Sequence, residues 1–302
     1  MKIEIYPPLS IHELGQRTNQ EDFIAQWNNR LFVLCDGMGG HEKGEVASQT
    51  VCQSLVGWFD EHVNLNEPFT DDILREALEY AYMQLDQYDD GSPKKMGTTL
   101  TLLYMHNNGV TAAHIGDSRI YHIRPEQGVL YQSRDHSLAF DLFQAGEITY
   151  EEIATFPQKN IVTRAMTPGK DNRMRPDIIH INNIHSGDCF ILCSDGMLEN
   201  MDIDVLSRLF LTNKVSELIS YTENNQDNHS AWFVHVKEAI REYADNISED
   251  EESTARCNAI NIIPQTVPQD EDDVVIVEDA PKKQSIFQRI KKLFLFTKNK
   301  KK

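Results

Sequence analysis

Short apolar runs rich in β-prone residues alternate with polar turn residues along much of this chain. Two of these runs end in the same way, because Leu31–Cys35 leads into Asp36-Gly37 and Cys189–Ser194 leads into Asp195-Gly196. Runs that stop at turn residues are typical of buried strands that end in tight turns. Two such strands, each with an aspartate at its tip, predict two carboxylates that converge on a cation. A plain Asp-Gly turn is the alternative interpretation.

The region between the two runs predicts antiparallel strands. Thr98–Tyr104 and Val110–Ile115 flank Asn107-Asn108-Gly109, and Asn-Gly between β-prone runs is a strong hairpin signal. Ile120–Ile123 resumes the pattern, and Gly128–Gln132 is expected to be a further antiparallel partner.

Apolar residues recur at helical spacing in two consecutive segments. Glu45–Phe59 and Ile73–Leu85 each carry one apolar stripe, and Thr70 is a predicted N-cap of the second helix. Helices between strand-forming regions predict an α+β fold in which helices cover antiparallel sheets. Residues 138–160 predict a short helical surface insertion, and such insertions often act as lids.

Charge and cysteine content narrow the class of protein. The chain has 302 residues and a formal net charge of −18, of which the first 244 residues carry −17. This charge argues against a nucleic-acid partner. The five cysteines have no zinc-ribbon spacing and indicate reduced thiols. Because there is neither a signal peptide nor a run of 18 apolar residues, we expect a cytoplasmic protein, and we expect it to be a monomer.

Composition divides the chain into three parts. Residues 1–244 predict one compact catalytic domain, and residues 245–281 predict an acidic, disordered linker. Residues 282–302 form a basic tail with nine basic and no acidic side chains. Its large apolar residues share one helical face, namely Ile286, Phe287, Ile290, Leu293 and Phe294. The tail predicts a helix that lies on an anionic membrane, with docking on a partner or on the acidic domain, or a solubilising role, as alternatives.

Aspartates stand at the edges of several predicted strands, namely Asp22, Asp36, Asp117, Asp195 and Asp227. Hard cations such as Mg²⁺ and Mn²⁺ prefer oxygen ligands, whereas thiolate or imidazole sites need clustered Cys and His. The aspartates therefore predict a site for Mg²⁺ or Mn²⁺.

In order and spacing, the motifs around these aspartates resemble those of the metal-dependent protein phosphatases, the type 2C serine/threonine family, in its bacterial branch. The matching segments lie between residues 12 and 236 and are Arg17–Asp22, Asp36–His41, Gly44-Glu45, Ala47-Ser48, Gly97–Thr99, Gly116–Arg119, Arg134–Ser137, Asn160–Ala165, Ser194–Gly196 and Asp227-Asn228. The resemblance implies a four-layer αββα sandwich of two antiparallel sheets flanked by helix pairs. It also implies a centre of two Mn²⁺ or Mg²⁺ ions in the cleft between the sheets, and residues 138–160 would be the flap beside that cleft.

The resemblance assigns a ligand role to several residues. Asp36 would bridge both ions, the backbone carbonyl of Gly37 would bind one of them, and Asp195 and Asp227 would hold the other. Asp117 would belong to a third, weaker metal site.

Other residues would act on water and phosphate. Glu21 and Asp22 would act through metal-bound water, and Arg17 would bind the substrate phosphate, so that Arg17 and Asp36 are the predicted catalytic residues. A hydroxide shared by the ions would attack phosphoserine or phosphothreonine directly. Met38 stands where some members have a histidine proposed as general acid, and His41 is interpreted as structural.

Structural roles are predicted for the remaining matched residues. Arg119 would brace the hairpin, Asp135–Ser137 would fix the start of the flap, and Arg164 would be an ion-pair partner. His114 and His122 are expected to be strand residues that face a polar surface.

The predicted function is therefore a serine/threonine protein phosphatase that opposes a Ser/Thr kinase, with a possible position at the inner face of the membrane through the tail. A phosphoprotein-binding pseudophosphatase on the same fold is the first alternative, but Asp36, Asp195 and Asp227 are all present. A two-metal nuclease is the second, and the net charge of −18 argues against it.

Overall fold

The computed structural model describes residues 1–39, 42–91, 95–170 and 173–240. These residues belong to one compact unit, Met1–Asp245. The linker predicted at 245–281, the tail predicted at 282–302 and His41 lie outside the described residues. Within the described part of the chain, no helix is both long enough and apolar enough to cross a membrane.

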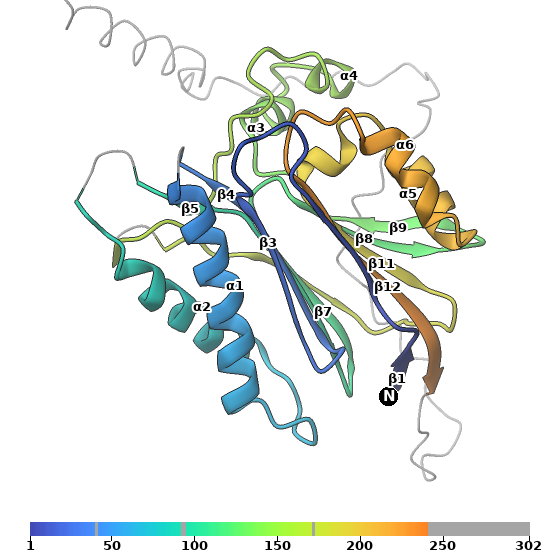
Figure 1. Cartoon of the computed structure of the whole chain (residues 1–302). Coiled ribbons are helices and arrows are strands. Elements are labelled where there is room, and N and C mark those ends of the chain that lie inside the picture. Colours follow the sequence, from blue (N-terminus) through green and yellow to red (C-terminus); the bar gives the residue numbers. More distant parts are fainter. Residues whose placement is uncertain (40–41, 92–94, 171–172, 241–302) are drawn as a thin grey trace, which may run out of the picture. The chain divides into compact units, whose positions relative to one another are not determined.

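Two antiparallel six-stranded sheets face each other (Figure 1). The first sheet has the order β1 (Lys2–Ile5), β12 (His229–Ile240), β11 (Cys189–Cys193), β8 (Arg119–Arg124) and β9 (Gly128–Gln132), and β2 (Leu9–Glu13) also pairs with β12. The second has the order β10 (Asp177–Ile181), β7 (Gly109–Ile115), β6 (Leu100–His106), β4 (Leu31–Met38) and β3 (Asp22–Trp27), and β5 (Gly97–Thr98) pairs with β4. The predicted hairpin is confirmed as β6 and β7, and β9 is confirmed as the partner of β8.

Helices cover the outer face of each sheet (Figure 1). The second sheet is covered by α1 (Glu42–His62) and α2 (Asp71–Asp86), and the Thr70 side chain accepts a hydrogen bond from the Ile73 N–H, as predicted for an N-cap. The first sheet is covered by α5 (Ile203–Leu211) and the shorter η3 (Val215–Leu218) and α6 (Ile219–Thr222). Residues 138–160 contain α3 (Leu138–Gln144) and α4 (Tyr150–Ile153), which confirms the helical insertion.

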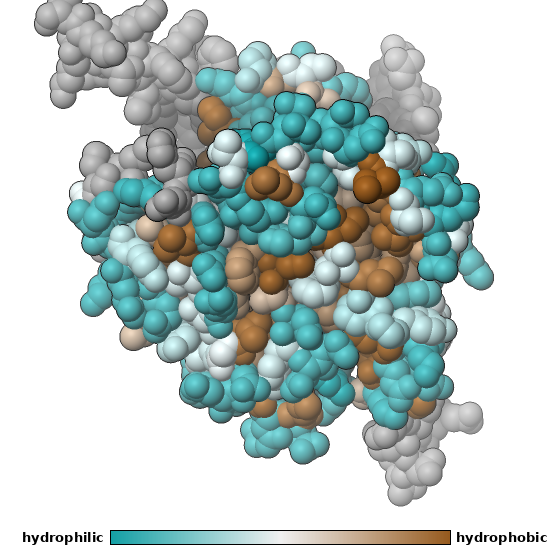
Figure 2. All heavy atoms as spheres, viewed as in Figure 1, coloured by the Kyte–Doolittle hydropathy of each residue, from teal (hydrophilic) through white to brown (hydrophobic). Residues whose placement is uncertain are grey.

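The alternation of side chains along β4 explains the four layers. Leu31, Val33 and Cys35 are fully buried against α1 and α2, whereas Phe32 and Leu34 are fully buried between the sheets. Successive side chains of a strand point to opposite faces, so a strand buried on both faces reads as one continuous apolar run. Residues of β11 alternate in the same way between the inter-sheet core and the core beneath α5. Figure 2 shows hydrophobic residues on the surface chiefly in the band between β3 and β12, where the two sheets meet.

The prediction of a tight turn directly after Asp36 is wrong. Strand β4 continues through Gly37 to Met38 and pairs there with β5. A Cβ atom at Gly37 would lie 2.1 Å from the backbone oxygen of Gly44 and 2.6 Å from that of Glu21. Gly37 is therefore needed because the start of α1 and the residue before β3 both approach its backbone closely.

The predicted polar surface beside the two strand histidines is also wrong. His114 is 2% exposed and His122 is 3% exposed. The ring of His114 hydrogen-bonds the carbonyl of Arg134, and His122 Nε2 lies 2.9 Å from an oxygen of the fully buried Asp188. Buried imidazoles satisfied in this way are structural, and the alternating sequence pattern did not reveal their partners.

Candidate metal centre

Antiparallel pairing places the ends of four strands at one end of the two sheets. Asp22 at the start of β3 is directly opposite Asp36 near the end of β4. On the other sheet, β11 ends at Cys193, just before Asp195, and β12 begins at His229, just after Asp227. The structure therefore brings together the aspartates that the sequence placed at strand edges.

Asp22 has a carboxylate oxygen that none of the described residues satisfies. The residue is 2% exposed, and its Oδ2 accepts a hydrogen bond of 2.8 Å from the Ser194 hydroxyl. Its Oδ1 is buried and accepts no hydrogen bond from the described residues. The pKa of Asp22 is raised to about 7. Burial is the largest cause, and the carboxylates of Asp195 and Asp227 contribute to the same rise. A buried, unpartnered carboxylate oxygen is the kind of atom that a cation would satisfy.

Asp36 lies at the electrostatic centre of the group. Burial raises its pKa well above the usual value, and Asp22, Asp195, Asp117 and Asp227 each raise it further. Like charges at close range oppose ionisation, and a bound divalent cation reverses that effect.

Asp117 and Asp195 also have raised pKa values. Burial, followed by the charges of Asp195 and Asp135, raises the pKa of Asp117 to about 7. Partial loss of hydration is the first cause of the raised pKa of Asp195, and the charge of Asp227 is the second. Asp195 is nevertheless exposed at the surface. Clustered carboxylates with raised pKa values are a donor set that fits hard divalent cations.

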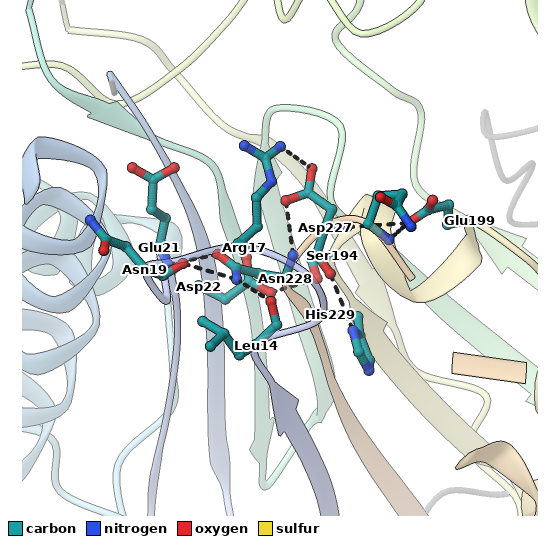
Figure 3. A network of polar contacts seen from close by, with 11 residues as sticks. Leu14, Arg17, Asn19, Glu21, Asp22, Ser194, Glu199, Asp227, Asn228 and His229 are labelled. Carbon is teal, nitrogen blue, oxygen red and sulfur yellow. Dashed lines mark hydrogen bonds and ion pairs between the residues drawn. The ribbon is translucent and has the colours of Figure 1, made fainter. Parts of the chain in front are cut away.

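Arg17 is a cation that directly contacts this group. Its Nη2 donates a hydrogen bond of 2.7 Å to Asp227 Oδ2, and the two side chains are 53% and 40% exposed. The hydrogen bond to Asp227 is the main reason that the pKa of Arg17 is raised, and the charges of Glu21 and Asp36 add to it. In Figure 3 the side chains of Glu21, Arg17 and Asp227 extend to the same side of the backbone.

Asn228 joins the loop before β3 to the loop before β12. Its Oδ1 accepts a hydrogen bond of 2.8 Å from the backbone N–H of Glu21, and its Nδ2 donates to the carbonyls of Leu14 and Asn19 (Figure 3). The carbonyl of Glu21 in turn accepts bonds from the Gly37 N–H and from the Ser48 hydroxyl. These hydrogen bonds thus fix the positions of backbone segments from both sheets around the carboxylates.

Three residues of the matching motifs, to which the sequence assigned no role, support the aspartates. Ser194 donates to Asp22 and accepts a hydrogen bond from the backbone N–H of Ser230, and the Thr99 hydroxyl accepts one from the Asp36 N–H. Asn228 is the third. Two of the three directly adjoin an aspartate in sequence, and that adjacency is the signal that could have identified them.

The start of the flap is fixed to the loop that carries Asp117. Arg119 donates to both oxygens of Asp135, at 2.7 and 2.6 Å, and His136 exchanges hydrogen bonds with Gly116 through its backbone N–H and its Nδ1. The predicted structural roles of Arg119 and Asp135 are confirmed. Arg164 lies 3.1 Å from Asp177, which confirms its prediction as an ion-pair partner.

His114, His136 and Asp177 form a second group of potential metal ligands, with ligand atoms within 4.8 Å of one another. The Gly116 N–H donates to Nδ1 of His136, so the neutral ring carries its proton on Nε2, which lies 3.2 Å from Asp177. A metal would need the lone pair of that nitrogen. This group is therefore a hydrogen-bonded support for the flap, as predicted for His136, rather than a cation site.

Comparisons with known proteins agree with this geometry. The family model described as protein phosphatase 2C matches residues 12–243. The protein phosphatase PhpP of Streptococcus pneumoniae serotype 2 is 36% identical over 226 residues, which are 70% of this chain and 89% of that protein. The serine/threonine protein phosphatase PstP of Mycobacterium tuberculosis is 33% identical over 206 residues, which are 67% of this chain and 38% of PstP.

Solved structures lead to the same family. The crystal structure of the M. tuberculosis phosphatase PstP/Ppp superimposes with a TM-score of 0.67 at 27% identity, and covers 78% of this chain and 100% of that chain. Stp1 from Staphylococcus aureus gives 0.66 at 30% identity, covering 78% and 96%. The PstP catalytic domain in complex with two manganese ions gives 0.64 at 27% identity, covering 78% and 99%. This chain therefore belongs to the protein phosphatase 2C family, the metal-dependent serine/threonine protein phosphatases.

Proposed function

We propose that this chain hydrolyses phosphoserine and phosphothreonine in proteins at a centre of two Mn²⁺ or Mg²⁺ ions. Asp36 would contribute to both ions, the Gly37 carbonyl would bind one of them, and Asp195 and Asp227 would hold the other. The observation that carries this proposal is the central place of Asp36, whose pKa is raised by every other aspartate of the group. A carboxylate that interacts with all the others is the one suited to serve both ions.

Glu21, Asp22 and Asp117 complete the proposed site. Glu21 and Asp22 act through water, and the buried, unpartnered Oδ1 of Asp22 supplies an acceptor for it. Asp117 serves a third, weaker site beside the start of the flap. When bound, the ions lower the pKa of a water between them and offset the charge on the phosphoryl group.

Arg17 binds the phosphate of the substrate in this proposal. Its guanidinium is about half exposed and already lies beside an anionic group, the carboxylate of Asp227. A planar guanidinium offers several donors in a geometry that matches phosphate oxygens. An anion bound at the carboxylate cluster would therefore meet an exposed cation at Arg17.

Further proposals concern partners and location. The phosphatase acts on phosphoproteins and opposes a Ser/Thr kinase, and the catalytic domain is a monomer. The basic tail, residues 282–302, carries nine basic side chains, and each one near an anionic surface contributes about 1 kcal/mol. We infer that it holds the protein at the inner face of the membrane, with the acidic linker as a tether.

Without metal, the free energy of unfolding of the protein should fall as the pH rises, because the carboxyl group of Asp117 must then ionise in the folded state. The pKa of Asp117 is raised above its value in the unfolded chain, so the folded state binds an extra proton that it loses as the pH rises towards 8. We expect Asp117→Asn in EDTA to be more stable than the wild type at pH 8, by several degrees in Tm, and the difference should shrink as the pH falls towards about 4, the usual pKa of an aspartate. Thermal melts of both proteins measure this. A difference in Tm that does not grow with pH would contradict the assignment, and buried histidines such as His114 cancel in the comparison.

Loss of a central carboxylate should abolish metal-dependent turnover. Asp36→Asn and Asp195→Asn are each expected to lower kcat for p-nitrophenyl phosphate and phosphothreonine peptides by about 100-fold or more. The far-UV circular dichroism spectrum should be unchanged. Asp72→Asn, on the exposed side of α2, is the matched control. Full activity of the wild type in excess EDTA would rule out the metal mechanism.

Arg17→Ala should mainly raise KM for phosphorylated substrates. We expect an increase of about tenfold or more, because a hydrogen bond to a charged group is worth about 1.5–3 kcal/mol, whereas kcat should change less. Steady-state kinetics with a phosphothreonine peptide, beside the exposed control Arg75→Ala, separate the two constants. A lower kcat with an unchanged KM would show that Arg17 acts elsewhere in the reaction.

The tail proposal predicts binding to membranes. The full-length protein should sediment with anionic liposomes at low salt, and a chain that ends at Asp279 should stay in the supernatant. Neutral phosphatidylcholine liposomes and high salt should both weaken the sedimentation of the full-length protein, since the attraction is partly electrostatic. Equal partitioning of the two proteins would exclude an anchor in residues 280–302.

A further inference from the structure

A polar depression lies beside the candidate metal centre. It is lined by Glu199, Asn200, Ser220, Tyr221, Asn224 and Gln226, and we call it the Glu199 pocket. Its walls come from the end of η2 (Asp195–Leu198), from α6 and from the loop that leads into β12. None of these residues is among the proposed metal ligands.

The pocket adjoins one of those ligands directly. Oε2 of Glu199 accepts hydrogen bonds from the backbone N–H groups of Gln226, at 2.8 Å, and Asp227, at 3.3 Å. Asp227 is itself 2.7 Å from Arg17. Figure 3 shows Glu199 on the side of Asp227 that is away from Arg17. A phosphoprotein bound at Arg17 would therefore extend past Asp227 to the pocket within about three residues, at about 3.3 Å per extended residue.

The pocket contains several unused hydrogen-bond acceptors. Each of its amide side chains uses one N–H of its NH₂ group within the protein, because Asn200 donates to Asn225, Asn224 to Glu223, and Gln226 to the carbonyl of residue 224. Among the described residues, nothing donates to the side-chain oxygens of Asn200, Asn224 or Gln226, or to Oε1 of Glu199. The Ser220 hydroxyl likewise donates to the carbonyl of Glu217.

The pocket also carries a negative charge, that of Glu199. Within the described part of the chain, no lysine or arginine pairs with Glu199, and Lys214, on the neighbouring η3 segment, is engaged by Glu217 at 3.1 Å. The ring of Tyr221, which packs on the core beneath α5, adds an aromatic wall. A negative pocket with unused acceptors and an aromatic ring suits a cation that carries several donors.

We propose that the Glu199 pocket binds a basic side chain of the phosphoprotein substrate, arginine in preference to lysine, within three residues of the phosphorylated residue. Arginine has five N–H donors and no acceptor, which complements the unused amide oxygens and the carboxylate of Glu199. This inference rests on the proposed phosphatase function and names a determinant of its substrate choice.

The test uses full-length protein with Mn²⁺ and phosphothreonine peptides that differ only in having Arg, Ala or Glu at one position near the phosphate. We expect the wild type to prefer Arg over Ala in kcat/KM by about tenfold at one such position. Glu199→Gln keeps an oxygen for the N–H groups of Gln226 and Asp227 but removes the charge, so the Arg-to-Ala ratio should fall to near one. Asn224→Lys places a cation in the pocket and should reverse the preference towards Glu.

Glu223→Gln is the matched control, because Glu223 is an exposed acid of the same loop that does not line the pocket, and glutamine keeps an oxygen to accept the hydrogen bond from Asn224. It should retain the preference for Arg. Equal hydrolysis of all peptides by the wild type, an equal loss in Glu223→Gln, or a retained preference in Asn224→Lys would overturn the assignment while the phosphatase activity stood. A wild type that hydrolysed none of the peptides would instead refute the proposed function.

Discussion

Repulsion among aspartates gathered at one end of the sandwich is the constraint on which the rest of this structure depends. Asp36 interacts unfavourably with four other aspartates, and partial burial strengthens the interactions with those that are least exposed to water. Two arginines relieve the repulsion only in part: Arg17 pairs with Asp227, and Arg119 acts on Asp117 and Asp195 while it is bound to Asp135. Divalent cations are the natural complement, and the family to which the chain belongs uses them.

The scaffold tolerates the repulsion because the backbone around the carboxylates is fixed independently of them. Direct pairing of β3 with β4 sets Asp22 opposite Asp36, and Asn228 holds the loops before β3 and β12 together. The absence of a side chain at Gly37 lets the start of α1 approach the end of β4. Such support keeps the carboxylates in place in the absence of a cation, which would reduce the free energy needed to organise a metal site.

Much of this arrangement could be predicted from the sequence because it depends on local patterns. Continuous apolar runs identified β4 and β11 as buried strands, and Asn108-Gly109 identified the hairpin. The partners of polar residues could not be predicted, because they come from distant parts of the chain. Ser194 reaches Asp22 across 172 positions, and the burial of His122 depends on Asp188. The Glu199 pocket could not be predicted for the same reason, since the groups available for binding in it depend on which hydrogen bonds the fold already makes.

The claim that Asp36 serves two cations is tested most directly by electron paramagnetic resonance of the Mn²⁺-loaded protein. Two Mn²⁺ ions that share a carboxylate are magnetically coupled, so the wild type should bind two ions tightly and give the spectrum of a coupled pair. Asp36→Asn should lose that coupled spectrum while the protein remains folded. A wild type that binds one ion, or two uncoupled ions with spectra unchanged in Asp36→Asn, would contradict the account.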